Sequence, residues 1–281
     1  MSSATVDDPT RRLMARYLPF IALLIVYAPA LYGLVVDWAQ DSNYSHGFLI
    51  PLVTGWLLWQ KRATLKAAPL TTDGFGLAIV TVAGLMFVLG NAGAEYFTMR
   101  LSFVAALFGL TLYLFGRTVV KLVWFELAFL CFMIPIPYVV YYALTFPMQL
   151  LASKITAGIL SGVGMAVYRQ GNILHLPGGS SLEVAEACSG MRSLVSLLAL
   201  GALYAQLTQN RFSAKVILFL STVPIAVVAN VFRVFVTALL VTTVSPEATS
   251  EPMHTIMGMS VFVVSFVLLF IFGAILKQVC K

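Results

Sequence analysis

Residues 214–243 of the chain read AKVILFLSTVPIAVVANVFRVFVTALLVTT. This run exceeds the roughly 20 apolar residues that a helix needs to cross a bilayer, so it predicts a membrane helix that tilts or projects beyond the hydrocarbon. Apart from Lys215 near its start, its one charge is Arg233. Because a charge inside a membrane helix is costly, Arg233 is a candidate functional residue. Asn230, one turn earlier, indicates that this face is polar and turned toward the protein interior.

The whole chain shares this apolar character. Its 281 residues are 60% hydrophobic and 10% charged, whereas soluble domains have about 25% charged residues. We therefore expect an all-α polytopic membrane protein with a single domain over residues 1–281. The first apolar segment follows no signal-peptide pattern and is expected to stay as an anchor. About eight transmembrane helices are expected, some of them short, at approximately residues 17–36, 47–60, 74–91, 101–116, 122–137, 187–208, 214–243 and 254–276.

Residues 138–186 form an expected insertion between the fifth and sixth spans. Its first part is amphipathic and rich in small residues, which predicts an interfacial helix. Its second part, AVYRQGNILHLPGGSSLEVAEA at 166–187, alternates apolar and polar residues around Pro-Gly-Gly and predicts a small β-hairpin. Because a hairpin edge would lack hydrogen-bond partners in lipid, we expect the hairpin in water, on the outer (periplasmic) side.

The basic residues orient the spans. With residues 1–16 as a cytoplasmic tail, eight spans place 12 of the 17 Lys and Arg residues inside. The positive-inside rule then favours a cytoplasmic N-terminus and a cytoplasmic C-terminus. The net charge of +6 is spread over these groups without a long basic block, so nucleic acid is not an expected partner.

This topology brings three reactive side chains to the outer ends of three consecutive spans: Cys188, Arg233 and His254. A neighbouring cation lowers the pKa of a thiol and favours the reactive thiolate. An imidazole can accept a proton and later protonate a leaving amine, and a guanidinium can donate to the oxygen that gains charge in a tetrahedral intermediate. The set therefore suits acyl transfer from a peptide carbonyl through a thioester.

Each of these residues also has a simpler interpretation. Cys188 could be a small apolar side chain near a helix start, Arg233 could extend to lipid head groups, and His254 could lie at the interface without any chemistry. Their joint placement favours a catalytic site. No Cys/His spacing suggests a metal site, and no cofactor is expected. Weaker candidates for substrate-binding or supporting roles are Arg192, Glu186, Asn230 and His46.

At these positions the sequence resembles the exosortase/archaeosortase family of membrane transpeptidases. The resemblance consists of EACSG at 186–190, NVFR at 230–233 and His254 in the following span. YSHGFLIP at 44–51 and the approach to the cysteine from residue 176 extend it over most of the chain. Each motif is short, and their order along the chain gives the resemblance its specificity.

The resemblance implies a membrane cysteine protease and transpeptidase of the exosortase type. Cys188 would be the nucleophile, Arg233 the stabiliser of the oxyanion or the substrate, and His254 the acid and base. The substrates would be exported proteins with a C-terminal sorting signal, which is a PEP-CTERM-like motif such as Pro-Glu-Pro, a transmembrane helix and a basic tail. Cleavage would pass through a thioacyl intermediate to an unknown acceptor nucleophile. The expected setting is a bacterial inner membrane, with the site facing the periplasm and a link to protein sorting and exopolysaccharide or biofilm assembly.

Two other classes of function stay open. A transporter or flippase for a lipid-linked saccharide would also be polytopic with charges at its outer face, although no inverted repeat is evident. A noncatalytic membrane scaffold could use the small-residue runs AGILSG and SGVGMA at 157–166 to pack helices.

Overall fold

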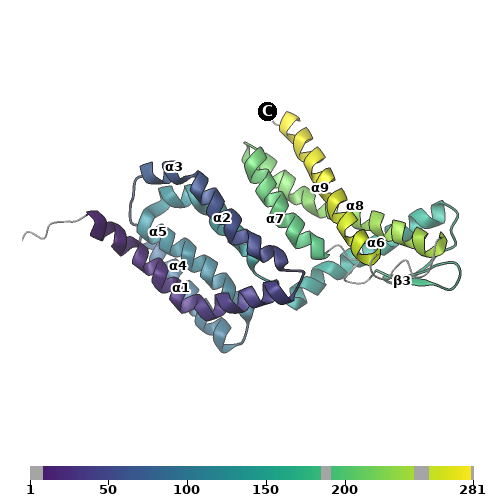
Figure 1. The fold of residues 1–281 in the computed structure, drawn as a ribbon, viewed down its shortest axis with the longest axis horizontal. Helices are drawn as coiled ribbons and strands as arrows, with labels where there is room; N and C mark the ends of the chain where they lie inside the picture. Colours follow the sequence, from purple (N-terminus) through teal and green to yellow (C-terminus); the bar gives the residue numbers. More distant parts are fainter. Residues whose placement is uncertain (1–8, 185–190, 244–252, 280–281) are drawn as a thin grey trace, which may run out of the picture. The chain divides into compact units, whose positions relative to one another are not determined.

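The computed structural model describes residues 9–184, 191–243 and 253–279 of the chain (Figure 1). The chain divides into two compact units, Met1–Ile136 and Pro137–Lys281. The described elements of the first unit are α1 (Pro9–Gln40), the 3-10 helix η1 (Ser45–Phe48), α2 (Leu49–Gln60), α3 (Arg62–Ala67), α4 (Phe75–Ala92), α5 (Tyr96–Phe129) and η2 (Leu130–Met133). Those of the second unit are α6 (Tyr138–Gly162), β1 (Tyr168–Gln170), β2 (Ile173–His175), β3 (Ser181–Glu183), α7 (Met191–Thr208), α8 (Phe212–Thr243) and α9 (Met253–Val279).

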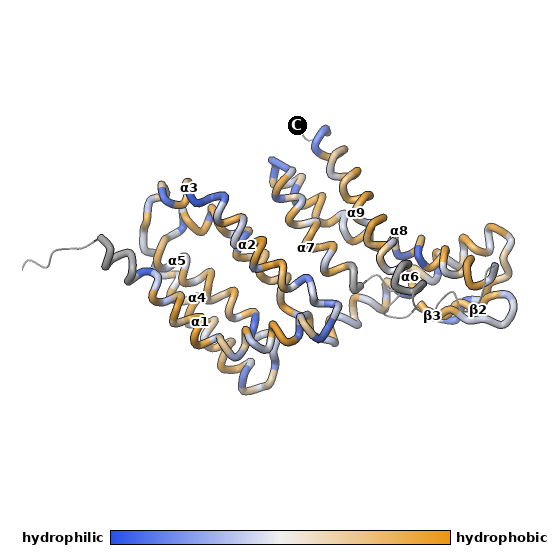
Figure 2. Tube along the Cα trace, viewed as in Figure 1, coloured by the Kyte–Doolittle hydropathy of each residue, from blue (hydrophilic) through white to orange (hydrophobic). Residues whose placement is uncertain are grey.

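Six helical segments of the described chain are long and apolar enough to cross a membrane: Arg16–Gln40, Phe75–Ala92, Tyr96–Met133, Tyr138–Gly162, Phe212–Thr243 and Gly258–Val279. A shorter apolar segment covers Leu194–Thr208. Figure 2 shows hydrophobic residues along most of these helices and hydrophilic residues in several of their connections. The predicted class, an all-α polytopic membrane protein with a small outlying β element, is confirmed.

The predicted spans correspond to these segments with several differences. The spans predicted at 101–116 and 122–137 lie in one continuous assignment, α5 followed by η2. The helix predicted to lie in the interface is α6, which at 25 residues is also long and apolar enough to cross. The span predicted at 47–60 is the 12-residue helix α2, too short to count among the six.

The chain reverses direction inside α5, at Gly116. The backbone there is not helical, with φ 82° and ψ 178°, a conformation that is open essentially to glycine alone. Phe115, next to this break, packs against Tyr17 near the start of α1, with ring centroids 6.2 Å apart.

The start of α5 and the residues that follow its end both contact the C-terminal end of α1. Arg100, early in α5, pairs with Asp37 near the end of α1, with Nη1 and Oδ2 2.7 Å apart. Trp38, next to Asp37, donates from Nε1 to the carbonyl oxygen of Met133 at 2.8 Å. Because both arms of α5 reach the same end of α1, the chain crosses this unit twice between residues 96 and 133. The sequence prediction of two spans here agrees with this path.

The first arm of α5 forms a helical hairpin with α4. The carboxylate of Glu95 accepts hydrogen bonds from the backbone N–H groups of Phe97 and Thr98 at 3.1 and 2.8 Å, and this cap fixes where α5 begins. A Cβ on Gly109 would lie 2.9 Å from the carbonyl oxygen of Gly76. The two backbones therefore touch, as small residues permit between membrane helices.

A buried ion pair joins α2 to the second arm of α5. The fully buried carboxylate of Glu126 lies 2.7 Å from Lys61 Nζ, which also donates to the carbonyl oxygen of Leu122 at 2.6 Å. A carboxylate in an apolar helix is tolerated when a cation pairs with it. Glu126 therefore has an interhelical structural role.

In the second unit, α7, α8 and α9 alternate in direction. A Cβ on Gly201 of α7 would lie 2.5 Å from Thr222 Oγ1 of α8, so these helices are in close contact. Gln209, just after α7, donates from Nε2 to the carbonyl oxygen of Gly273 in α9 at 3.0 Å. The final turns of α7 and α9 thus lie together near the beginning of α8. The first turns of α7 and α9 consequently lie toward the C-terminal half of α8.

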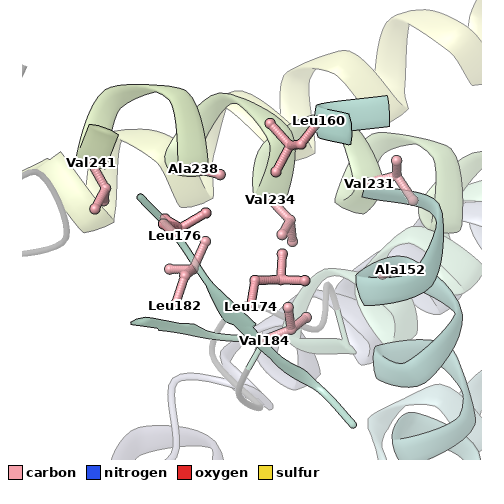
Figure 3. Packing of buried hydrophobic residues seen from close by; sticks show 10 residues of the cluster. All are labelled: Ala152, Leu160, Leu174, Leu176, Leu182, Val184, Val231, Val234, Ala238 and Val241. Carbon is pink, nitrogen blue, oxygen red and sulfur yellow. The ribbon is translucent and has the colours of Figure 1, made fainter. Parts of the chain in front are cut away.

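The sheet is an antiparallel meander in the order β1-β2-β3. The turn at Gly171 and Asn172 joins β1 to β2, and the Pro-Gly-Gly segment joins β2 to β3. β2 and β3 confirm the predicted hairpin, and β1 is an additional strand of the same sheet. Figure 3 shows its apolar face against α6 and α8, in a core of Ala152, Leu160, Leu174, Leu176, Leu182, Val184, Val231, Val234, Ala238 and Val241.

The sheet indicates which part of α8 lies in lipid. α8 has 32 residues, or about 48 Å at 1.5 Å per residue, and the hydrocarbon of a bilayer is about 30 Å thick. The sheet packs against residues 231–241 of α8, and the edge of a sheet is not stable in lipid. The C-terminal third of α8 therefore projects beyond the hydrocarbon, in agreement with its excess length.

Candidate functional site

A buried polar stripe runs along α8 where the sheet packs on it. Arg233 is 5% exposed, Asn230 one turn earlier is 2% exposed, and Thr237 one turn later is buried as well. Residues three and four positions apart share a helix face, so the three side chains point to one side of α8. Arg233 lies where α8 leaves the hydrocarbon, so the free-energy cost of burying its guanidinium is lower than at the centre of the bilayer.

A small recess opens between this stripe and β3. Leu182, Glu183 and Val184 line it from the strand, and Arg233, Val234 and Thr237 line it from α8. A guanidinium donates hydrogen bonds, and carbonyl and carboxylate oxygens accept them. Arg233 thus contributes hydrogen-bond donors to a narrow recess whose other walls include Leu182, Val184 and Val234.

Asn230 adds a second polar group next to Arg233. Among the described residues, its Oδ1 has no hydrogen-bond partner. A buried amide oxygen without a partner costs free energy, about 1–3 kcal/mol. Such an atom is able to accept a hydrogen bond from a donor, and the supporting role of Asn230 stays a prediction.

The other predicted site residues of this unit lie at the edge of what the structure describes. Cys188 and Glu186 fall in residues 185–190, outside the described residues. Arg192 and His254 are each the second residue of a helix, α7 and α9 respectively. The structure describes the helix at both positions but not the side chain.

The starts of α7 and α9 lie at the Arg233 end of the helix group. Measured from the contact between Gly201 and Thr222, Arg233 is eleven residues further along α8, about 16 Å. Met191, the first residue of α7, is ten residues back from Gly201 along the antiparallel helix, about 15 Å. The first turn of α7 and Arg233 are therefore at similar height, and α9 begins at the same end.

His46 belongs to the first unit. In η1, its Nε2 lies 3.2 Å from the carbonyl oxygen of Phe132, and nearby Tyr44 donates from its hydroxyl to the carbonyl oxygen of Ile136 at 3.5 Å. Burial lowers the pKa of His46, so the neutral ring with a proton on Nε2 can donate to Phe132. Helix ends leave carbonyl groups that need such partners. The predicted candidate His46 thus has a structural contact at the end of α5 and η2.

Glu183 and Thr237 line the recess but were not among the predicted site residues. Thr237 follows Arg233 by four residues, and that spacing within an apolar helix is a signal that could have identified it. Glu183 has no such local signal, because its position beside Arg233 depends on how β3 packs on α8. Within the described residues, no group of three or more His, Cys, Asp or Glu could hold a metal ion.

The apolar helices define a multi-span membrane protein, and its second unit has a buried arginine in a recess beside a small sheet. A family model for the transmembrane exosortases (Exosortase_EpsH) matches residues 38–271. The chain belongs to this family, and the matched region contains all of the candidate site residues. The family acts on protein substrates, and membership is consistent with a transpeptidase role. Comparisons with curated proteins and with solved structures found no match.

Proposed function

We propose that this chain is a membrane cysteine protease and transpeptidase that cleaves the C-terminal sorting signal of exported proteins. The signal consists of a PEP-CTERM-like motif, a transmembrane helix and a basic tail. The observation that carries the proposal is the buried guanidinium of Arg233, in a recess lined by the strand whose chain continues to Cys188. An arginine in this position has a direct use in acyl transfer, as the donor to a developing oxyanion.

Covalent geometry supports Cys188 as the nucleophile. Val184 lines the recess, and four residues of chain span at most about 14 Å. Met191, at the Arg233 end of α7, follows Cys188 by only three residues. Cys188 therefore follows, by four residues, a strand end that lines the recess, which supports its proposed role.

The reaction proceeds in two halves. The Cys188 thiolate, formed when His254 takes the thiol proton, attacks the carbonyl carbon of the scissile peptide bond, and Arg233 donates to the resulting oxyanion. The C–N bond breaks, His254 gives its proton to the leaving amine, and a thioester remains on Cys188. An acceptor nucleophile then gives its proton to His254 and attacks the thioester, which releases the product and returns the proton to Cys188. Asn230, Arg192 and Glu186 support substrate binding in this scheme.

The proposed setting is a bacterial inner membrane, with both termini in the cytoplasm and the recess facing the periplasm. A substrate with one transmembrane helix would then present its signal motif at the outer end of that helix. Its basic tail would stay in the cytoplasm by the positive-inside rule. The biological role in this scheme is sorting of surface proteins in connection with exopolysaccharide assembly.

The test is processing of a co-expressed reporter that carries such a C-terminal signal. Cys188→Ala should abolish processing, whereas the matched control Cys131→Ala should leave it unchanged. Arg233→Lys should slow processing about 100-fold or more, because the ammonium lacks the planar fork of the guanidinium. His254→Ala should slow processing at either proton-transfer step. Immunoblots of the membrane fraction would verify equal amounts of each variant.

Specific results would contradict parts of this scheme. Full processing by the Cys188→Ala protein would eliminate the enzyme proposal and favour the transporter or scaffold classes. Normal turnover by Arg233→Lys would exclude a bidentate or planar role for the guanidinium. If His254→Ala left the rate and its pH dependence unchanged, the acid and base role would belong to another residue.

A further inference from the structure

β3 is an edge strand of the sheet formed by the described residues, and its outer edge presents backbone groups at regular spacing. Its ladder with β2 runs through the even-numbered residues, because Leu176 N donates to Ser180 O at 2.8 Å and Val184 N donates to Asn172 O at 2.9 Å. Alternate residues of an antiparallel strand direct their N–H and C=O groups to opposite sides. The backbone groups of the two odd-numbered residues, Ser181 and Glu183, therefore point away from β2.

These outward groups are available for pairing. Ser181 and Glu183 are both exposed. Within the described chain, neither residue makes a backbone hydrogen bond outside the sheet. Two residues with outward N–H and C=O groups, two positions apart, match the hydrogen-bonding repeat of an added antiparallel strand.

The same edge adjoins the recess of Arg233. Leu182, Glu183 and Val184 line this recess together with residues of α8. A chain that pairs with β3 would continue past Glu183 toward the buried guanidinium of Arg233, a group with several N–H donors. Strand pairing and the guanidinium would then hold consecutive parts of one extended peptide.

The opposite edge of the sheet lacks this arrangement. In β1, Tyr168 and Gln170 pair with β2 and Arg169 points outward. The Arg169 side chain folds back, with Nη1 donating to the carbonyl oxygen of Gly171 at 2.7 Å. β2 separates β1 from β3, and no residue of β1 lines the recess.

We infer that the free edge of β3 binds an extended segment of the protein substrate, which adds to the sheet as a fourth strand through Ser181 and Glu183. This inference rests on the proposed function, because it identifies how that substrate is held. Main-chain pairing of this kind provides affinity with little dependence on sequence, and side-chain preference arises only at alternate positions of the peptide.

The test exploits the fact that proline lacks the N–H group. Glu183→Pro removes one outward donor and leaves the ladder with β2 intact, as edge strands allow. Arg169→Pro does the same at the opposite edge and is the matched control. Glu183→Ala retains the N–H and isolates the contribution of the carboxylate. We expect Glu183→Pro to slow processing of the signal-bearing reporter roughly tenfold, the equivalent of one lost hydrogen bond. Arg169→Pro should stay within about twofold of the parent, and the loss in Glu183→Pro should exceed any loss in Glu183→Ala.

A cross-linking measurement covers the case in which Glu183→Pro does not fold. A photoreactive benzoylphenylalanine is placed at position 181 or 169 of the Cys188→Ala protein, and the same reporter is co-expressed. Cross-links to the reporter from position 181 and not from position 169 support the inference. Equal yields from both positions, or none from position 181, would overturn it.

The inference and the proposed function can fail separately. If the parent protein processes the reporter and Cys188→Ala does not, the proposed function stands. Processing by Glu183→Pro at the parental rate would then refute strand addition alone. Absence of processing by the parent protein would instead refute the proposed function, and the cross-linking result would decide whether β3 binds the reporter.

Discussion

Single residues of the site differ in how far the sequence alone could identify them. Arg233 is conspicuous because it is a charge within a long apolar run, and the cost of burying it points to function. The structure places it beside Glu183, about fifty residues earlier in the chain, by packing β3 on α8. No local pattern predicts such a contact, since it depends on tertiary packing. Cys188 stays a sequence prediction, as it lies outside the described residues.

His46 gives a prediction at the residue scale. Burial holds its pKa below the ordinary value of about 6.5, so below that pH the unfolded chain binds more protons than the folded one. The stability that His46 contributes is therefore fully present above pH 6.5 and is lost as the pH falls through the folded-state pKa. We expect the midpoint of thermal unfolding in detergent to fall between pH 7.5 and pH 5.

The variant His46→Gln identifies the residue responsible. Glutamine keeps an N–H group that can donate to the carbonyl oxygen of Phe132, but it does not titrate. The pH-dependent part of the loss should shrink in this variant. Identical pH dependence in His46→Gln and the parent would assign the effect to other groups.

The sequence predicts a helix or strand best where residues close in the chain determine its conformation. The Pro-Gly-Gly turn and the alternating residues around it were sufficient for the hairpin of β2 and β3. The additional strand β1 pairs with β2 across the short Gly171–Asn172 turn. The alternating residue pattern continues through this turn, so the pattern does not separate β1 from the rest of the hairpin. α6 was assigned to the interface from its amphipathic residues, yet its length and composition suffice for a crossing. The same apolar residue types are used for side chains that pack against a sheet or another helix and for those that face lipid. The sequence pattern alone therefore does not distinguish these environments.

The reversal at Gly116 supports a prediction at the element scale. A Cβ at this position would overlap the side chain and backbone of Thr71, and the backbone conformation disfavours every residue with a Cβ. Gly116→Ala should lower the free energy of unfolding by about 1–2 kcal/mol or more. Gly84→Ala is the matched control, since Gly84 lies within α4 and a Cβ there meets no atom within 4 Å. Thermal unfolding in detergent compares the two, and equal midpoints would contradict the proposed strain at Gly116.

At the scale of the whole molecule, charge is distributed unequally between the two ends of the first unit. The contact between Tyr17 and Phe115 places the Gly116 reversal at the Tyr17 end of α1. Lys61 contacts Leu122 and Glu126, which follow this reversal in the second arm of α5. The cations at or next to this end are Arg16, Lys61, Arg62, Lys66, Arg117 and Lys121. At the opposite end Arg100 is paired with Asp37. By the positive-inside rule this asymmetry favours a cytoplasmic location for the Tyr17 end.

This orientation can be measured with single cysteines in a chain whose three native cysteines are replaced. Lys66→Cys, on the exposed surface of α3, tests the cation-rich end, and Arg169→Cys, on exposed β1, tests the sheet. In intact spheroplasts a membrane-impermeant maleimide should label Arg169→Cys, and it should label Lys66→Cys only after the membrane is opened. Gly84→Cys, on the exposed face of α4 in the middle of a span, should react in neither state, because the reaction needs a thiolate in water. The reverse pattern would place the recess of Arg233 in the cytoplasm, where it could not meet the outer end of a substrate helix.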